Sequence, residues 1–443
     1  MLVITFGYIL LGTLIWMVEK ARIIKSGPDL LTFFILMLVI QMVLPGMFLT
    51  AVAGLFSGEI NIGVPFMDKV LNEIGFYEIA LVFILLFLFV LSLYAFWFLV
   101  NQKINLQKNY TTKIKITVSF WRWLVVMIMG LIGMWILLKE LDGYNNVVFF
   151  RSDETGTRKG FVASNLFSLT TTFMMLSVVG MIMFWKKKIS VKFLFSLGCF
   201  SVFALMTASR RAFMIGFLLI FFTLALWRMK IDINKSAIIA VLLFIPIVIY
   251  GKSVLWLLAH NLDITIEAIS LSSENILLSG STLFMANIGI STIESWATLL
   301  YLDIPLRFGI DHVLSIARRI PDGIMGLDIT FPERMVRIST QAFVGSDRQD
   351  VPPGLIGQMW LDFGLFGPII WGMFFCLIIA LLQTLYNRVE KDCAGVSLFV
   401  LLIYTVSLPI NSGTFDFVFS VNVFFLMMFI IFMIKIKKRR VYD

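Results

Sequence analysis

Two adjacent arginines, Arg210 and Arg211, stand between two long apolar runs, in the stretch from Thr207 to Phe213. A guanidinium group so close to hydrocarbon is costly unless it faces a wet cavity or an anion. Its planar fork can bind a phosphate or a carboxylate through two parallel hydrogen bonds. The pair therefore indicates an oxyanion ligand. Snorkelling of both side chains to lipid headgroups is the alternative interpretation.

The elements that carry these arginines are predicted to be membrane helices, because the composition excludes other classes. Of the 443 residues, 60% are apolar and only 14% are charged, and the mean hydropathy is +0.95. A soluble domain has about a quarter charged residues. The expected surroundings are therefore a lipid bilayer. Nucleic acid is not an expected partner, because the sequence has no basic run interleaved with stacking aromatic residues in a soluble segment. The three cysteines show neither metal nor disulfide spacing.

The predicted fold class is all-α, a polytopic membrane protein with about eleven transmembrane helices. A crossing helix needs about 20 mostly apolar residues, and eleven stretches meet this condition. The first is interpreted as a retained span rather than a cleaved signal peptide. The predicted spans are 1–18, 30–56, 78–100, 117–138, 162–185, 191–207, 212–227, 236–258, 354–385, 395–410 and 414–434.

The basic residues predict the orientation of these spans. One set of alternate connections, with the C-terminal tail, holds 16 Lys and 5 Arg, which places it in the cytoplasm and the N-terminus outside. The outer connections hold 4 Lys and 10 Arg. Positive-inside bias does not predict that Arg replaces Lys in the outer connections. The Arg-rich outer connections therefore again indicate an oxyanion ligand, and pairing of these arginines with loop carboxylates is the alternative interpretation. Within the spans, the sequence is interpreted as nearly charge-free apart from Arg122.

One outer connection, 259–353, is far longer than the others and divides the chain into three parts. Helices 1 to 8 occupy 1–258, and helices 9 to 11 with a basic cytoplasmic tail occupy 354–443. Segment 281–301 is nearly apolar enough to cross, but Asn287, Ser291 and Glu294 argue against lipid exposure. It is interpreted as a re-entrant or interfacial helix over a cavity. The spacing in 311–320 predicts another helix, which Pro321 ends.

The stretch from Pro352 to Gly367 begins the ninth predicted span. Its glycines at 354, 357, 364 and 367 permit close helix contact. An Arg-containing small-residue turn before an apolar span, a long outer loop and this P-x-L-I-G…F-G-x-x-G stretch resemble the O-antigen or oligosaccharide repeat-unit polymerases of the Wzy type. The resemblance covers the whole chain in topology and only short stretches in motif.

The resemblance implies a type-C glycosyltransferase-like fold in the bacterial inner membrane. Such enzymes work on the periplasmic face and transfer a growing glycan from its undecaprenyl diphosphate to the next lipid-linked repeat unit. It implies no cofactor, and a chain-length regulator is a candidate partner. Arginines in outer loops are the family's functional residues, although loop 139–161 lacks the family's R-x10-G pattern after Arg151. Those residues correspond here to Arg210 and Arg211 as catalytic groups and to Arg151, Arg158, Arg318, Arg319, Arg334 and Arg337 as diphosphate-binding groups.

This chemistry needs groups that stabilise the leaving diphosphate and a base that takes the proton of the acceptor hydroxyl. Preorganised arginines can do the first. With no DxD motif and no histidine cluster of metal spacing, we predict a metal-independent, inverting displacement. The leading base candidates are His312 and Asp350, ahead of Glu333 and Asp311. An imidazole accepts protons near neutral pH, but a lone loop histidine also serves commonly as an ordinary hydrogen-bonding residue.

Two other functions stay open. An O-antigen ligase shares the layout and the donor but attaches the glycan to lipid A core or protein. A flippase or exporter of lipid-linked sugars is expected to carry charged residues within its spans and to have pseudo-symmetric halves, and the sequence indicates neither.

Overall fold

The computed structural model describes residues 1–27, 29–55, 65–106, 112–143, 161–184, 190–206, 285, 288–317, 335–345, 351–390, 393–407, 410, 413 and 421–440. This part of the chain is mostly helical. The chain divides into two compact units, each described by itself below. Unit 1 comprises Met1–Asn109, Leu278–Thr384 and Ile403–Ser420, and unit 2 comprises Tyr110–Leu277, Leu385–Leu402 and Val421–Asp443.

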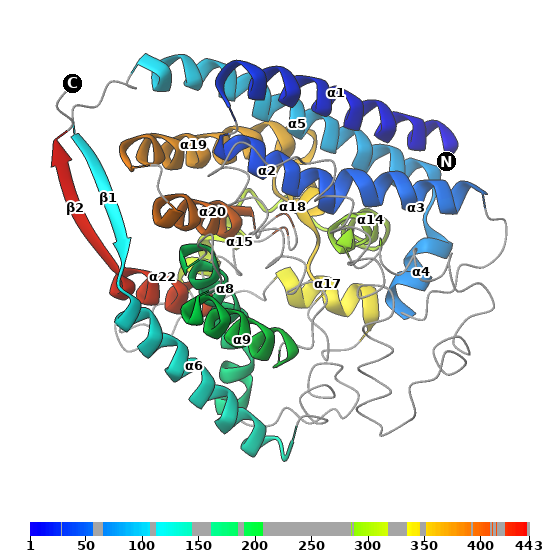
Figure 1. The fold of residues 1–443 in the computed structure, drawn as a ribbon. Coiled ribbons are helices and arrows are strands. Elements are labelled where there is room, and N and C mark those ends of the chain that lie inside the picture. Colours follow the sequence, from blue (N-terminus) through cyan, green and yellow to red (C-terminus); the bar gives the residue numbers. More distant parts are fainter. Residues whose placement is uncertain are drawn as a thin grey trace. The chain divides into compact units, whose positions relative to one another are not determined.

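The N-terminal part of unit 1 consists of apolar helices that pack side by side. They are α1 (Leu2–Ser26), α2 (Leu30–Leu38), the π-helical η1 (Val39–Val43), α3 (Leu44–Leu55), α4 (Pro65–Glu73) and α5 (Phe76–Leu106). Figure 1 shows α1, α3 and α5 in blue and cyan along one side of this unit. Gly46 lets α1 approach α3, because a Cβ there would lie 2.5 Å from the ring of Tyr8. Thr5 also donates a hydrogen bond to Thr50 over 3.0 Å.

The remaining helices of unit 1 come from the long predicted loop and the ninth predicted span. They are α14 (Ile290–Tyr301), α15 (Ile310–Ala317), α17 (Met335–Val344), α18 (Leu355–Phe363) and the 3-10 turn η2 (Gly364–Phe366), followed by most of α19 (Gly367–Arg388) and the end of α20 (Cys393–Ser407). Every residue of α14 from Ser291 to Thr298 is buried. This burial favours the re-entrant interpretation over the interfacial one, because a helix lying on a membrane surface exposes one face.

Helices α14 and α18 meet through small residues and hydroxyl groups. The backbone N–H groups of Leu355 and Gly357 donate to the hydroxyls of Ser291 and Ser295, over 3.0 and 3.2 Å. A Cβ at Gly357 would lie 2.8 Å from Thr298. The close contact predicted for glycines of this stretch is confirmed here, and it explains how a helix containing several polar residues is buried.

The predicted span 354–385 corresponds to Leu355–Arg388, which is long and apolar enough to cross a membrane, but the helix is interrupted at η2 between α18 and α19. Gly364 has a φ of 57°, a left-handed conformation that glycine adopts without penalty. A Cβ at Gly367 would lie 1.9 Å from the carbonyl oxygen of Met359. The chain therefore turns sharply here, so that the first turns of α19 return toward the end of α18.

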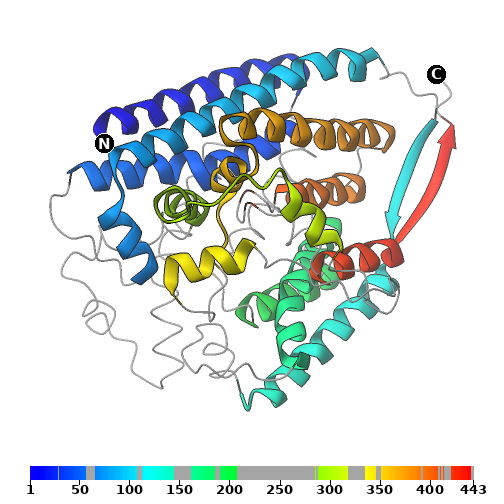
Figure 2. The ribbon, with the colours of Figure 1, turned by 180° about the vertical axis from the view of Figure 1, so that it is seen from behind.

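Unit 2 combines apolar helices with a two-stranded antiparallel ribbon, visible from both sides in Figures 1 and 2. Its main elements are β1 (Thr112–Val118), α6 (Phe120–Glu140), α8 (Phe161–Phe184), α9 (Val191–Met206), α22 (Val421–Met433) and β2 (Ile434–Arg440). Trp123 is fully buried between α6 and α8, where its indole N–H donates to the carbonyl of Leu176 over 3.0 Å. Gly180 makes the space for this ring, since a Cβ there would lie 2.3 Å from it.

Nine of the eleven predicted spans fall on described helices, and the spans 212–227 and 236–258 lie outside the described residues. Five of these stretches are long and apolar enough to cross a membrane: Leu2–Lys25, Leu30–Leu55, Phe76–Val100, Phe120–Glu140 and Leu355–Arg388. The other four are shorter apolar helices. The number of crossings and their orientation stay predictions. The all-α class needs one correction, because Thr112–Val118 and Ile434–Arg440 pair as strands where β-branched residues recur with a period near two.

Candidate functional site

The buried carboxylate of Asp362, at the end of α18, is the centre of the main polar cluster of unit 1. Its side chain is fully buried. One oxygen, Oδ1, accepts from the side-chain amide of Gln358 over 2.9 Å and from the backbone N–H of Gly309 over 3.3 Å. The other, Oδ2, accepts from the indole N–H of Trp371 over 3.0 Å and lies 3.0 Å from Nε2 of His312. Four partners thus fix the carboxylate and satisfy its charge.

His312 lies on α15 and is held in one orientation by this carboxylate and by an aromatic ring. Its side chain is 12% exposed. The ring of Trp371 contacts the imidazole edge to face, with 4.5 Å between the centroids. Because a carboxylate accepts, Nε2 carries the proton and Nδ1 becomes the basic nitrogen of the neutral ring. The same carboxylate stabilises the charged form that arises when Nδ1 takes a proton.

The local backbone explains how α15 reaches α18. The N–H groups of Arg307 and Phe308 donate to the carbonyls of Leu361 and Asp362, over 2.7 and 2.9 Å, and so satisfy two of the last carbonyls of α18. Phe308 has a φ of 50° and Gly309 a φ of 73°. A left-handed aromatic residue is uncommon and persists only where its surroundings impose it. The turn is therefore specified by its hydrogen bonds to the end of α18.

Arg307 and Asp311 form a two-pronged ion pair beside the histidine. Nε and Nη2 of the arginine donate to the two carboxylate oxygens over 2.9 and 2.7 Å. The hydrogen bonds that Arg307 donates to Asp311 raise the pKa of its guanidinium, although burial opposes this. Both carboxylate oxygens of Asp311 are thus bound by the arginine. The structure describes two of the four candidates for the base, Asp311 and His312. Because Asp311 is bound to Arg307, the surroundings favour His312 as the base.

Most of the predicted site residues lie outside the described residues. These are Arg151, Arg158, Arg210, Arg211, Arg318, Arg319, Glu333, Arg334 and Asp350. Arg337 is described, with an exposed side chain on α17, a helix that packs against α14. The gathering of the predicted arginines around one anion therefore stays a prediction.

Sequence reasoning missed Asp362, the residue on which this cluster depends. The interpretation that Arg122 is almost the only charged residue in the spans is wrong, because Asp362 stands in the predicted span 354–385 and is buried. An ionisable residue in an apolar segment is itself a signal of a functional site. Nothing in the sequence indicated the partners Trp371 and Arg307. The break at η2 brings Trp371 to Asp362, and the turn at Phe308 brings Arg307 to Asp311.

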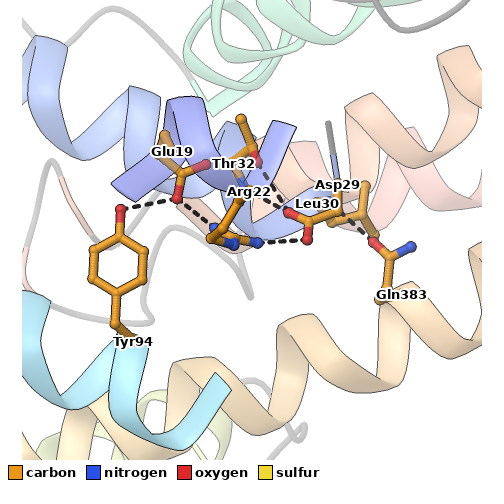
Figure 3. A network of polar contacts seen from close by, with 7 residues as sticks. All are labelled: Glu19, Arg22, Asp29, Leu30, Thr32, Tyr94 and Gln383. Carbon is orange, nitrogen blue, oxygen red and sulfur yellow. Dashed lines mark hydrogen bonds and ion pairs between the residues drawn. The ribbon is translucent and has the colours of Figure 1, made fainter. Parts of the chain in front are cut away.

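A second polar cluster, drawn in Figure 3, connects four helices of the same unit around Arg22 near the end of α1. The guanidinium is hydrogen-bonded to Glu19, and its Nη2 lies 2.5 Å from the carboxylate of Asp29. Tyr94 of α5 donates to Glu19 over 2.8 Å. Gln383 of α19 accepts from the first backbone N–H of α2 over 3.0 Å.

This second cluster has the character of a structural clamp. Its cation lies between two carboxylates, so the cluster offers no uncompensated positive charge to an anionic ligand. Asp29 also accepts from the backbone N–H of Thr32 and caps the start of α2. On α19, Gln383 is twelve residues from Trp371, about 18 Å at the helical rise. The clamp and the Asp362 cluster therefore occupy different levels of the same helix.

The fold and these clusters define the chain as a mostly helical protein with several apolar helices long enough to cross a membrane, and with a buried carboxylate–histidine pair. Comparison with protein-family models, with curated proteins and with solved structures found no match.

Proposed function

We propose that the protein is a membrane glycosyltransferase that polymerises undecaprenyl-diphosphate-linked oligosaccharide repeat units on the outer face of the bacterial inner membrane. The supporting observation is the pair of His312 and Asp362, with 3.0 Å between Nε2 and Oδ2 and a fully buried carboxylate. Such a pair is the usual arrangement of a general base, because the carboxylate fixes the tautomer and stabilises the imidazolium.

In the proposed reaction, Nδ1 of His312 takes the proton of the acceptor hydroxyl. The hydroxyl oxygen forms the new bond to the anomeric carbon of the donor glycan. The bond from that carbon to the diphosphate oxygen breaks, and the lipid diphosphate leaves with the electron pair and the additional negative charge. Arg210 and Arg211 remain the groups proposed to stabilise this charge. Arg307 is a poor candidate for that role, because its Nε and Nη2 already bind the carboxylate of Asp311.

Trp371 supports the proposal in a second way. Its ring packs against the imidazole and its N–H binds the same carboxylate, so one side chain restricts both partners. A base is most effective when its geometry is fixed before the substrate arrives. Preorganisation of this kind favours a chemical role over passive transport of the lipid.

The direct test uses the full-length protein in lipid nanodiscs. The substrate is the lipid-linked oligosaccharide pool extracted from cells that lack the protein. We expect a ladder of longer glycans on their lipid diphosphate, formed without nucleotide. His312→Gln should slow ladder formation by about 10²–10⁴-fold, the usual range for a lost general base. Asp303→Asn, which changes an exposed carboxylate on the chain just before Arg307, is the matched control and should leave the rate unchanged.

The other functions give different results in the same system. A ligase would leave the lipid-linked pool at one repeat length and extend only added lipid A core or protein. A flippase would move the lipid without forming a glycosidic bond. In cells, loss of a polymerase leaves lipopolysaccharide with core and a single repeat, whereas loss of a ligase leaves bare core. Unchanged polymer length with Arg211→Ala at normal abundance would exclude that arginine from the site.

A further inference from the structure

The ribbon of unit 2 pairs cations with cations. Its register places Lys113 opposite Arg439 and Lys115 opposite Lys437. Three further pairs contain one cation each, Thr112 with Arg440, Ile114 with Lys438 and Thr117 with Lys435. Like charges directly opposite each other destabilise a β-ladder. The ribbon therefore forms against its own charge and needs a compensating anion.

The register also sorts these charges between the two faces of the ribbon. Strand residues alternate between faces, so the pairs that contain positions 113, 115 and 117 share one face. That face holds five of the seven cations. The opposite face holds two cations and five β-branched apolar residues: Ile114, Ile116, Val118, Ile434 and Ile436. The result is an amphipathic ribbon with one strongly basic face.

Among the side chains of this face that the structure describes, Lys115 has an ion pair with Glu390, with 4.0 Å between Nζ and Oε2, the outer limit for an ion pair. Glu390 is also bound through its backbone, donating to the carbonyl of Ile114 over 2.9 Å. A single carboxylate at this distance compensates the charge of Lys115 only weakly.

The ribbon begins at the end of apolar helices. Only Ser119 separates β1 from α6, a helix long and apolar enough to cross a membrane, and β2 continues α22 directly. The backbone N–H of Ser119 donates to the carbonyl of Met433 over 3.1 Å and joins the two helix ends. Both views of the ribbon show it extending from this junction (Figures 1 and 2).

The same end of unit 2 carries aromatic and basic side chains of the kind found at membrane surfaces. Trp121 is exposed. Nζ of Lys192, in the first turn of α9, lies 4.3 Å from the ring centroid of Phe120. Phe120 also contacts Phe184 at the end of α8, with 5.3 Å between centroids. Aromatic residues and cations gather where helices leave the hydrocarbon region.

We propose that the basic face of the β1–β2 ribbon binds the headgroups of anionic phospholipids at the end of α6 and α22. The ribbon starts at the end of a helix that is long and apolar enough to cross a membrane, and its charge matches that of an anionic leaflet. The exposed Ile436, on the other face, fits the membrane boundary better than bulk water. This inference does not depend on the proposed enzymatic function.

The test measures amide hydrogen exchange of 112–118 and 434–440 in the full-length protein, in nanodiscs of pure phosphatidylcholine and of phosphatidylcholine with phosphatidylglycerol. We expect slower exchange in the anionic discs, by about fivefold for each cation that gains a headgroup, and loss of this difference at high salt. Amides of α8 around Leu176 serve as the internal reference and should not change.

Two variants make the result specific. Lys437→Gln removes the charge opposite Lys115, so exchange of the ribbon in neutral discs should become slower and its dependence on anionic lipid should weaken. Lys139→Gln, at the opposite end of α6, makes the same charge change and should behave as the original protein. Equal exchange in both kinds of disc would overturn the proposal and point to an acidic protein partner. Full protection by added inorganic phosphate in neutral discs would overturn it as well, since a lipid would then not be required.

Discussion

Replacing Asp362 by Asn tests the geometry around His312 most directly. The substitution keeps the size of the side chain and exchanges one accepting oxygen for a donating NH2 group. In the protein, both oxygens of Asp362 accept two hydrogen bonds each. An asparagine oxygen can keep one of these pairs, and its NH2 group then faces the two donors of the other pair.

The structure indicates which arrangement costs least. With the asparagine oxygen toward Gln358 and Gly309, the NH2 group faces His312 and Trp371. The imidazole can move its proton to Nδ1 and accept at Nε2, whereas the indole can only donate. One buried N–H then loses its partner, which costs about 1–3 kcal/mol of folding free energy. The histidine loses its proposed role as a base, because Nδ1 now carries a proton and cannot accept one from the substrate.

We therefore expect Asp362→Asn to fold with moderately reduced stability and to lose about 10²–10⁴-fold in glycan elongation rate. The assay combines thermal unfolding in nanodiscs with ladder formation at saturating substrate. The double variant with His312→Gln separates the two effects. If the aspartate acts only through the histidine, adding Asp362→Asn to His312→Gln lowers the rate no further, although it still lowers the stability.

Two results would refute this reasoning. One is an Asp362→Asn protein that is less stable but elongates glycans at the original rate. The other is a double variant whose loss of rate equals the product of the two single losses, because independent effects would then be acting. Asp303→Asn provides the reference for an exposed carboxylate in both measurements.

Three further predictions address how the fold holds the site. Trp371→Phe keeps the ring against the imidazole but removes a donor to a charged acceptor, so it should cost about 1.5–3 kcal/mol and lower the elongation rate, measured as above. Gly354→Ala should destabilise the contact between α14 and α18 by more than about 1 kcal/mol, because φ is 71° and a Cβ would meet a backbone oxygen at 2.4 Å; unchanged thermal unfolding would contradict this. Arg22→Met leaves two carboxylates without their shared cation and should cost up to about 3–5 kcal/mol, whereas Lys25→Met, near the end of the same helix, should have little effect on unfolding.

Much of the helical architecture could be predicted from the sequence, for a simple physical reason. A helix satisfies its backbone hydrogen bonds within its own segment, so an apolar run of sufficient length specifies the element locally. This is why the runs at 30–56 and 117–138 coincide closely with Leu30–Leu55 and Phe120–Glu140. The close helix contact at the glycines of 354–367 could also be predicted, because the absence of a side chain is a property of each residue by itself.

The ribbon and the break at η2 could not be read in the same way. The partners in the β1–β2 ladder are more than 300 residues apart, and the local alternation of residues in each strand does not name its partner. The break places the indole of Trp371 on Asp362, nine residues earlier, where a continuous helix would hold these positions about 13 Å apart.

The amino-acid sequence by itself determined that this is a chain of apolar helices with basic and arginine-rich connections, because hydropathy and charge are properties of single residues and short runs. It also singled out His312. Only the tertiary structure decided that His312 faces a buried carboxylate and that Asp311 is occupied by Arg307. The reason is that orientation and burial arise from contacts between segments, and a turn of a few residues at Phe308 and at Gly364 sets which side chains meet.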